Sequence, residues 1–141
     1  MRDSSISITD EVKAAMEKQA LESSPYECCG LLSGKDNLIT ASHALRNEAD
    51  RPLTNYFASP DDLFKAMRRM RKMHQEMLGI YHSHPRTQAY PSPTDVQMAF
   101  YPEAIYFIIS LEPQIELRAF RINSTIIEEV EFRVIEKSSK E

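Results

Sequence analysis

Two histidines and an aspartate lie close together in the sequence, in a pattern that could bind a metal ion. The stretch "YHSHPRTQAYPSPTD" contains His82, His84 and Asp95. Side chains two residues apart on a β-strand point to the same face, so the two imidazoles would project together. A catalytic zinc site takes three protein ligands and leaves one position open. Asp95 is the natural third ligand, because the proline-rich loop before it can fold back and zinc accepts mixed nitrogen and oxygen ligands.

A second interpretation of the same segment stays open. The run Ser92-Pro93-Thr94-Asp95 also has the form of a helix start, with a serine N-cap, proline at the first helical position and an acidic partner at the third. On that interpretation Asp95 needs no metal. The two interpretations can coexist, because a helix start would hold Asp95 in place. A lone His-x-His pair is weak evidence, so spacing alone does not decide between them.

A hydrolytic zinc site also needs a base that takes a proton from water and passes it to the leaving amine. Glu27 is the candidate, since it stands in "PYECCGLL" at the edge of an apolar strand, where most acidic residues would be out of place. The alternative is an ordinary exposed glutamate at a strand edge. A thiol enzyme that uses Cys28 or Cys29 with a histidine is a further alternative.

Alternating and helical patterns indicate the elements that position these residues. A short strand at "SISI" precedes a helix that begins after Thr9 as N-cap and ends before Pro25. "CCGLLSG" and "LITASHAL" are typical of a hairpin that turns at "GKDN". "MLGIYHSH" and "AIYFIISL" are predicted to be buried strands, with a short helix in "SPTDVQMAF" between them.

The segment "SPDDLFKAMRRMRKMHQEM" predicts the clearest helix. Ser59 is the expected N-cap, Pro60 takes the first helical position and Asp62 completes the capping pattern. The expected apolar stripe, on which His74 also lies, contains Leu63, Met67, Met70 and Met77.

The C-terminal third predicts a hairpin from "IELRAFRI" and "TIIEEVEFRVIE", which turns at "NS". Val130, Phe132 and Val134 are expected on one side of the second strand. The whole pattern predicts an α/β (α+β) fold, in which a mixed sheet of six or more strands carries two main helices. We expect a single domain over residues 1–141, with a core over about 5–135 and a frayed tail at 136–141.

Composition narrows the class of protein. The chain has 141 residues, which fits one domain, and its net charge of −4 argues against a general nucleic-acid binder. The basic cluster Arg68, Arg69, Arg71 and Lys72 is local and typical of a solvated helix face. There is no long apolar run and no signal-like N-terminus, so a soluble cytoplasmic protein without a membrane partner is expected. The two cysteines are adjacent, and no disulfide framework is expected.

Taken together, the motif residues resemble the JAMM (MPN+) zinc metallopeptidases. The family pattern is a glutamate and then, much later, His-(Ser or Thr)-His-Pro, six residues, Ser, two residues and Asp. Here it reads Glu27, "HSHP" at 82–85, "RTQAYP", Ser92, "PT" and Asp95. "CGLLSG", "GIYHSHP", "NEADRP" and "SPDDL" are also similar to family segments. The resemblance covers roughly residues 5–135 and looks like the compact, free-standing prokaryotic type.

The resemblance implies a cytidine-deaminase-like JAMM/MPN fold in which His82, His84 and Asp95 bind one Zn²⁺ per chain, with water as the fourth ligand. It implies that Glu27 is the general base and then acid for that water, and that Ser92 hydrogen-bonds the oxyanion. The implied reaction is hydrolysis of the amide or isopeptide bond after the C-terminal Gly-Gly of a ubiquitin-like β-grasp protein or a sulfur-carrier protein. Release of a C-terminal cysteine adduct is one example.

The family also contains members that have lost the motif and act as non-catalytic binding scaffolds. The complete motif disfavours that alternative for this chain. A homodimer is compatible with the sequence, which does not determine the oligomeric state.

Overall fold

In the computed structural model of the chain, residues 5–137 are described, and they form one mixed α+β domain. The expected fold class, with a mixed sheet and two main helices, is confirmed. The strands are β1 (Ile6–Thr9), β2 (Cys29–Lys35), β3 (Leu38–Leu45), β4 (Glu76–His84), β5 (Ile105–Ser110), β6 (Glu116–Asn123), β7 (Ile126–Val130) and β8 (Phe132–Ile135). The helices are α1 (Asp10–Ser23), α2 (Pro60–Lys72) and α3 (Pro93–Gln97).

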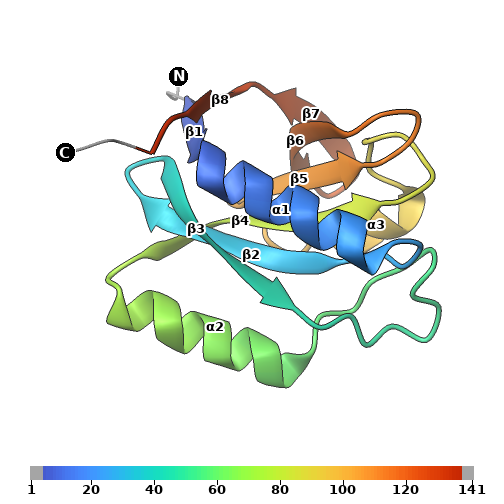
Figure 1. Cartoon of the computed structure of the whole chain (residues 1–141), viewed down its shortest axis with the longest axis horizontal. Helices are drawn as coiled ribbons and strands as arrows, with labels where there is room; N and C mark the ends of the chain where they lie inside the picture. Colours follow the sequence, from blue (N-terminus) through green and yellow to red (C-terminus); the bar gives the residue numbers. More distant parts are fainter. Residues whose placement is uncertain (1–4, 138–141) are drawn as a thin grey trace.

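The described strands form an eight-stranded sheet in the order β7-β6-β5-β4-β2-β3-β1-β8. The pairs β4/β5, β1/β3 and β1/β8 are parallel, and the other neighbours are antiparallel. β7 and β8 lie at opposite edges of this order, yet a single residue, Glu131, separates them in the chain. The sheet must therefore curl until its edges approach each other, and Figure 1 shows the short link between β7 and β8.

The prediction of one continuous C-terminal strand is wrong at Glu131. The hairpin between β6 and β7 turns at Ser124, which has a φ of 60°, as the "NS" pair predicts. After Glu131, however, the chain leaves β6 and pairs in parallel with β1 at the other edge of the sheet. Val130 is buried, whereas Val134 is 45% exposed, because β8 is an edge strand with little packed over it.

The two main helices cover opposite faces of the sheet (Figure 1). Met16 of α1 belongs to the same buried apolar cluster as Leu32 of β2. Met70 of α2 packs in a second cluster with Leu31. Successive strand residues point to opposite faces, so β2 contributes to both layers and is buried almost along its length.

The predicted N-caps of the two main helices are confirmed. The side-chain oxygen of Thr9 accepts the backbone N–H of Val12 at 3.2 Å, and that of Ser59 accepts the N–H of Asp62 at 3.2 Å. These bonds satisfy backbone donors that the first helical turn leaves free. Among the described residues, no helix combines the length and apolar character that crossing a membrane requires.

The end of α2 differs from its prediction. The helix stops at Lys72, and His74 adopts a left-handed backbone with a φ of 56°, so Met77 belongs to β4. His74 is exposed and is not part of an apolar stripe. Within the helix, Met70 is buried but Met67 is 39% exposed. Periodicity could not reveal this end, because the pairing of Glu76 with Gly34 of β2 draws the chain into the sheet.

The predicted frayed tail begins at residue 136. Residues 138–141 of that tail lie outside the described range. Lys137 donates its backbone N–H to Asp10 Oδ1 at 3.1 Å, and its Nζ lies 3.3 Å from a carboxylate oxygen of Glu11.

Gly34 in β2 provides a test of the sheet. A Cβ at this position would lie 1.8 Å from the carbonyl oxygen of Leu38, a backbone atom of the neighbouring strand. Gly34→Ala should therefore lower the free energy of unfolding by about 1–3 kcal/mol or more in chemical denaturation. Gly79→Ala, whose nearest contact is 3.1 Å, is the matched control and should cost less. Unchanged stability of Gly34→Ala would contradict the β2–β3 geometry.

Candidate metal centre

Strand β4 carries His82 and His84 to one face of the sheet at its C-terminal end. The strand is paired with β2 on one side and with β5 on the other, where the pairing continues to His84. Ser83, between the histidines, is fully buried, and its Oγ accepts the backbone N–H of Cys28 at 2.8 Å. The two imidazoles are only 2% and 4% exposed, so the sheet holds both side chains in a confined space.

The loop after β4 returns Asp95 to the two histidines. Ser92 is the N-cap of α3, and its Oγ accepts the N–H of Asp95 at 3.0 Å. In return, Oδ2 of Asp95 accepts the N–H of Ser92 at 2.9 Å, which completes a capping box. The predicted helix start is confirmed, and the same carboxylate oxygen lies beside both imidazoles.

Three potential ligand atoms meet at the corners of an equilateral triangle. Nε2 of His82, Nε2 of His84 and Oδ2 of Asp95 are 3.0 Å apart in every pair. The centre of such a triangle is about 1.7 Å from each corner, slightly less than a Zn–N distance of about 2.0–2.1 Å. The spacing of these three atoms therefore suits a zinc ion, which His82, His84 and Asp95 would hold. Among the described residues, these three form the group that could hold a metal ion.

The hydrogen bonds of His84 support a cation at this point. Its Nδ1 lies 2.8 Å from the carbonyl oxygen of Gln88, which can only accept, so Nδ1 carries the hydrogen. In the neutral imidazole, Nε2 then bears a lone pair that faces His82 and the carboxylate of Asp95. A cation between these electron-rich atoms removes the conflict, and an Nδ1–H bond to a carbonyl is usual for a metal-binding histidine. The residues present fit a zinc ion.

Protonation in the cluster follows from burial and close contact. Burial lowers the pKa of His82 against the opposing effect of Asp95, which favours the neutral imidazole that a metal requires. Burial also acts to lower the pKa of His84, but hydrogen bonds with Asp95 and Gln88 outweigh it and raise this pKa. Although burial opposes it, the two histidines hold the pKa of Asp95 well below its usual range. Asp95 is therefore a carboxylate at neutral pH.

Glu27 is buried beside this cluster, so the alternative of an exposed strand-edge glutamate is wrong. Glu27 is 7% exposed, and its Oε1 is buried without a hydrogen-bond partner among the described residues. Burial raises the pKa of Glu27 to about 8, with a lowering effect of His84 and a raising effect of Asp95. Those two effects show that the carboxyl group is electrostatically coupled to the triangle.

The cysteines do not form a thiol site. Both are buried, and neither forms a disulfide bond, as expected from the sequence. Burial raises the pKa of the Cys28 thiol to about 11 and that of Cys29 to about 12. A nucleophilic cysteine needs its thiolate at working pH, so the thiol-enzyme alternative is disfavoured.

Two residues that the sequence motif did not reveal support the site. Tyr56, in the loop between β3 and α2, stacks on His82 with ring centroids 4.5 Å apart and an interplanar angle of 22°. The side chain of Asn47 donates to the carbonyl oxygen of Glu27 at 3.0 Å. The aromatic pair Tyr56-Phe57 in the loop was the available sequence signal, but nothing local paired Tyr56 with His82.

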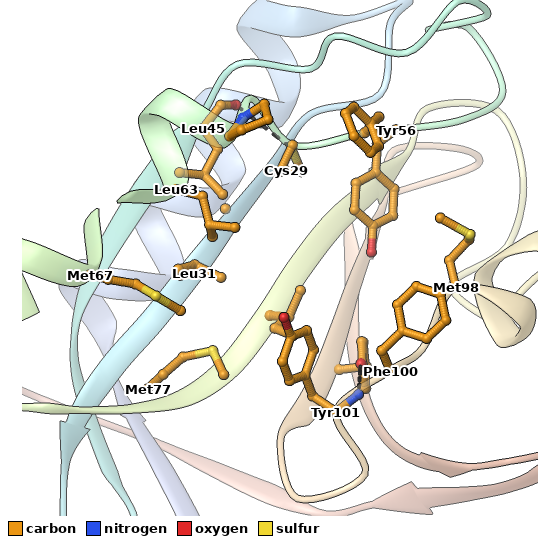
Figure 2. Close-up of a pocket in the computed structure, with 16 residues that line it drawn as sticks. Cys29, Leu31, Leu45, Tyr56, Leu63, Met67, Met77, Met98, Phe100 and Tyr101 are labelled. Carbon is orange, nitrogen blue, oxygen red and sulfur yellow. Dashed lines mark hydrogen bonds between the residues drawn. The ribbon is translucent and has the colours of Figure 1, made fainter. Parts of the chain in front are cut away.

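An apolar groove of about 240 Å³ adjoins the candidate centre. Figure 2 shows Tyr56 at one end of it, with α2 on one side and the segment after α3 on the other. Phe100 in that segment is 66% exposed. The other labelled side chains on these two walls are Leu63, Met67, Met98 and Tyr101.

Comparison with known proteins places this geometry in a family. The family model described as prokaryotic homologs of the JAB domain matches residues 9–123. The CysO-cysteine peptidase of Mycobacterium tuberculosis is 34% identical over 126 residues, which cover 87% of this chain and 86% of the relative. The desampylase of Haloferax volcanii is 29% identical, over 78% of this chain and 84% of the relative.

A solved structure agrees with the sequence relatives. A solution structure of a Desulfitobacterium hafniense protein superposes with a TM-score of 0.85 at 33% identity, and covers 94% of each chain. The expectations of a JAMM/MPN fold and of an enzyme of the hydrolase class are confirmed. With a family model that spans most of its length, the chain belongs to the prokaryotic homologs of the JAB domain.

Proposed function

We propose that this protein is a zinc peptidase that hydrolyses the amide or isopeptide bond after the C-terminal glycine of a ubiquitin-like or sulfur-carrier protein. The observation that carries the proposal is the convergence of three ligand atoms, 3.0 Å apart, beside the buried carboxyl group of Glu27. Relatives named CysO-cysteine peptidase and desampylase support this substrate class, which includes release of a C-terminal cysteine adduct.

His82, His84 and Asp95 would hold one zinc ion per chain. When bound, such an ion supplies a Lewis acid for the scissile carbonyl and lowers the pKa of water to about 7. The two neutral imidazoles and the carboxylate provide the ligand charge and softness that zinc accepts. The capping box restrains the orientation of Asp95, because its Oδ2 is already bonded to the backbone of Ser92.

Glu27 would move the proton during hydrolysis. It takes the proton from the attacking water and delivers it to the amine nitrogen of the leaving group as the C–N bond breaks. Its Oε1 can accept this proton, because none of the described residues forms a hydrogen bond with it. Burial raises the pKa of Glu27 to about 8, which suits delivery of the proton to the leaving amine near neutral pH.

Ser92 would stabilise the oxygen that becomes negative during the reaction. Its Oγ accepts the backbone N–H of Asp95, so its own hydroxyl hydrogen is left for another acceptor. A donor held in place at the start of α3 can face the developing charge without reorganisation.

The apolar groove would bind the carrier protein. Exposed apolar surface in a contiguous patch marks protein-binding sites, and this groove begins at Tyr56, whose ring contacts His82. The part of the substrate next to the scissile bond would enter this groove at Tyr56, and Phe100 and Met67 line the same groove. The complete ligand set and the buried Glu27 argue against a purely non-catalytic scaffold.

Metal content tests the ligand assignment. We expect about one zinc ion per chain in the purified protein, and loss of this zinc in His82→Ala and in Asp95→Ala, because each removes one corner of the triangle. His74→Ala is the matched control, since His74 is exposed and is not one of the three proposed ligands. Elemental analysis measures the content. Turnover by a fully metal-free protein would rule out the zinc mechanism.

Replacement of Glu27 tests the proton transfer. Glu27→Gln should lower kcat on a Gly-Gly-linked conjugate by roughly 10²- to 10⁴-fold, because the amide cannot take the proton, while zinc content and fold are retained. Glu22→Gln, an exposed glutamate at the end of α1, should behave as wild type. Equal turnover of Glu27→Gln and wild type would remove Glu27 from the mechanism.

A charge in the groove tests carrier binding. Phe100→Asp should raise KM for a folded carrier conjugate by about tenfold, with little effect on a short Gly-Gly peptide substrate. Phe64→Asp is the control, because Phe64 is 62% exposed on α2 but does not line the groove. Steady-state kinetics on both substrates separate the effects. An equal rise in KM for the carrier conjugate in Phe100→Asp and Phe64→Asp would show that the groove is not the binding surface.

A further inference from the structure

The two candidate histidine ligands are oriented by different means. His84 donates from Nδ1 to the carbonyl oxygen of Gln88 at 2.8 Å, which sets the plane of its ring. His82 has no such bond, because its Nδ1 is buried and no atom of the described residues partners it. A metal-binding histidine that lacks this second hydrogen bond needs another constraint on its ring.

Tyr56 supplies a contact of the required kind. Its ring lies nearly parallel to that of His82, with centroids 4.5 Å apart and 22° between the planes. The remaining ring contact of His82 is edge-on with His84, at a centroid distance of 4.8 Å. A flat ring stacked on an imidazole restricts rotation about the bond that carries the imidazole, while leaving Nε2 at the ring edge free to bind.

The backbone on both sides of Tyr56 is held by one side chain. Asn47 Oδ1 accepts the N–H of Phe57 at 2.9 Å, and Asn47 Nδ2 donates to the carbonyl oxygen of Asn55 at 3.0 Å. The same Nδ2 donates to the carbonyl oxygen of Glu27 at 3.0 Å. The loop that carries Tyr56 is therefore tied to the backbone of the proposed base.

We propose that Tyr56 is a positioning residue that orients His82 for metal binding in place of a hydrogen bond to Nδ1. Asn47 fixes the backbone around Tyr56 and bonds to the backbone of Glu27. The proposed ligand His82 and the proposed base Glu27 therefore keep the same relative position. This inference rests on the proposed function, because it assumes that His82 binds zinc. It assigns a role in metal affinity to a loop that contributes no ligand atom.

Zinc affinity of Tyr56 variants tests the inference. Tyr56→Leu should weaken Zn²⁺ binding by about tenfold or more in chelator competition and should alter the visible absorption spectrum of the Co²⁺-loaded protein, because the His82 ring is no longer held. Tyr56→Phe keeps the stacked ring and should bind Zn²⁺ within about threefold of wild type, with an unchanged Co²⁺ spectrum.

Tyr101→Leu is the matched control. Tyr101 is an aromatic residue on the same groove that does not stack on His82, so its replacement should leave both readouts unchanged. The thermal unfolding midpoint of each zinc-free variant separates lost affinity from lost fold. If Tyr56→Leu does not fold, Tyr56→Met, which fills similar space without a ring, is judged by the same criteria.

Wild-type Zn²⁺ affinity in a folded variant without the ring would overturn the positioning role. Equal weakening in Tyr56→Phe would also overturn it, because the hydroxyl group rather than the stack would then be responsible. Either result leaves the proposed function intact as long as His82→Ala loses its zinc. Absence of zinc binding in the wild type would instead contradict the proposed function itself.

Discussion

The geometry of the candidate centre depends on one carboxylate oxygen, Oδ2 of Asp95. It accepts the N–H of Ser92 and lies 3.0 Å from Nε2 of both His82 and His84. A buried charge is stable only when a donor or an opposite charge faces it; here the capping box supplies one donor, and a cation held at the triangle would supply the opposite charge. The start of a five-residue helix thus determines where the third ligand atom lies, and a shift of α3 would separate the triangle.

The fold also buries two polar atoms of this site that lack hydrogen-bond partners within residues 5–137. Oε1 of Glu27 and Nδ1 of His82 are both buried without partners among the described residues. A buried unsatisfied group costs about 1–3 kcal/mol, so a site with two of them must be stabilised by the surrounding structure. That structure is the curled sheet, in which β4 is paired on both sides and α1 and α2 bury opposite faces. Within the described part of the chain, the buried side-chain atoms without partners both lie at this site, and such a concentration is typical of a functional site.

The loop between β3 and α2 connects the proposed base Glu27 with the proposed ligand His82. Asn47 bonds to the backbone of Glu27 and to the residues on either side of Tyr56, and Tyr56 stacks on His82. Tyr56 also lines the apolar groove shown in Figure 2. One loop therefore contacts the proposed base, a proposed ligand and the proposed carrier-binding surface.

Much of this structure follows from local rules. The period of two along β4 predicts that His82 and His84 share a face, and the Ser-Pro-Thr-Asp pattern predicts the capping box, because both depend on residues a few positions apart. The ends of helices and strands were harder to predict from the sequence. The helix α2 stops at Lys72 and the C-terminal strand breaks at Glu131, since in both places pairing with a distant strand outweighs the local pattern.

The sequence by itself determined the class of fold and the candidate ligands, through short-range spacing and the family resemblance. Only the tertiary structure decided that Glu27 is buried against the triangle rather than exposed, and that Tyr56 stacks on His82. The physical reason is sequence separation. Glu27 and Tyr56 precede His82 by 55 and 26 positions in the chain, and no local propensity encodes proximity over that range. They arise when the curled sheet places the start of β2 and the loop after β3 beside the end of β4.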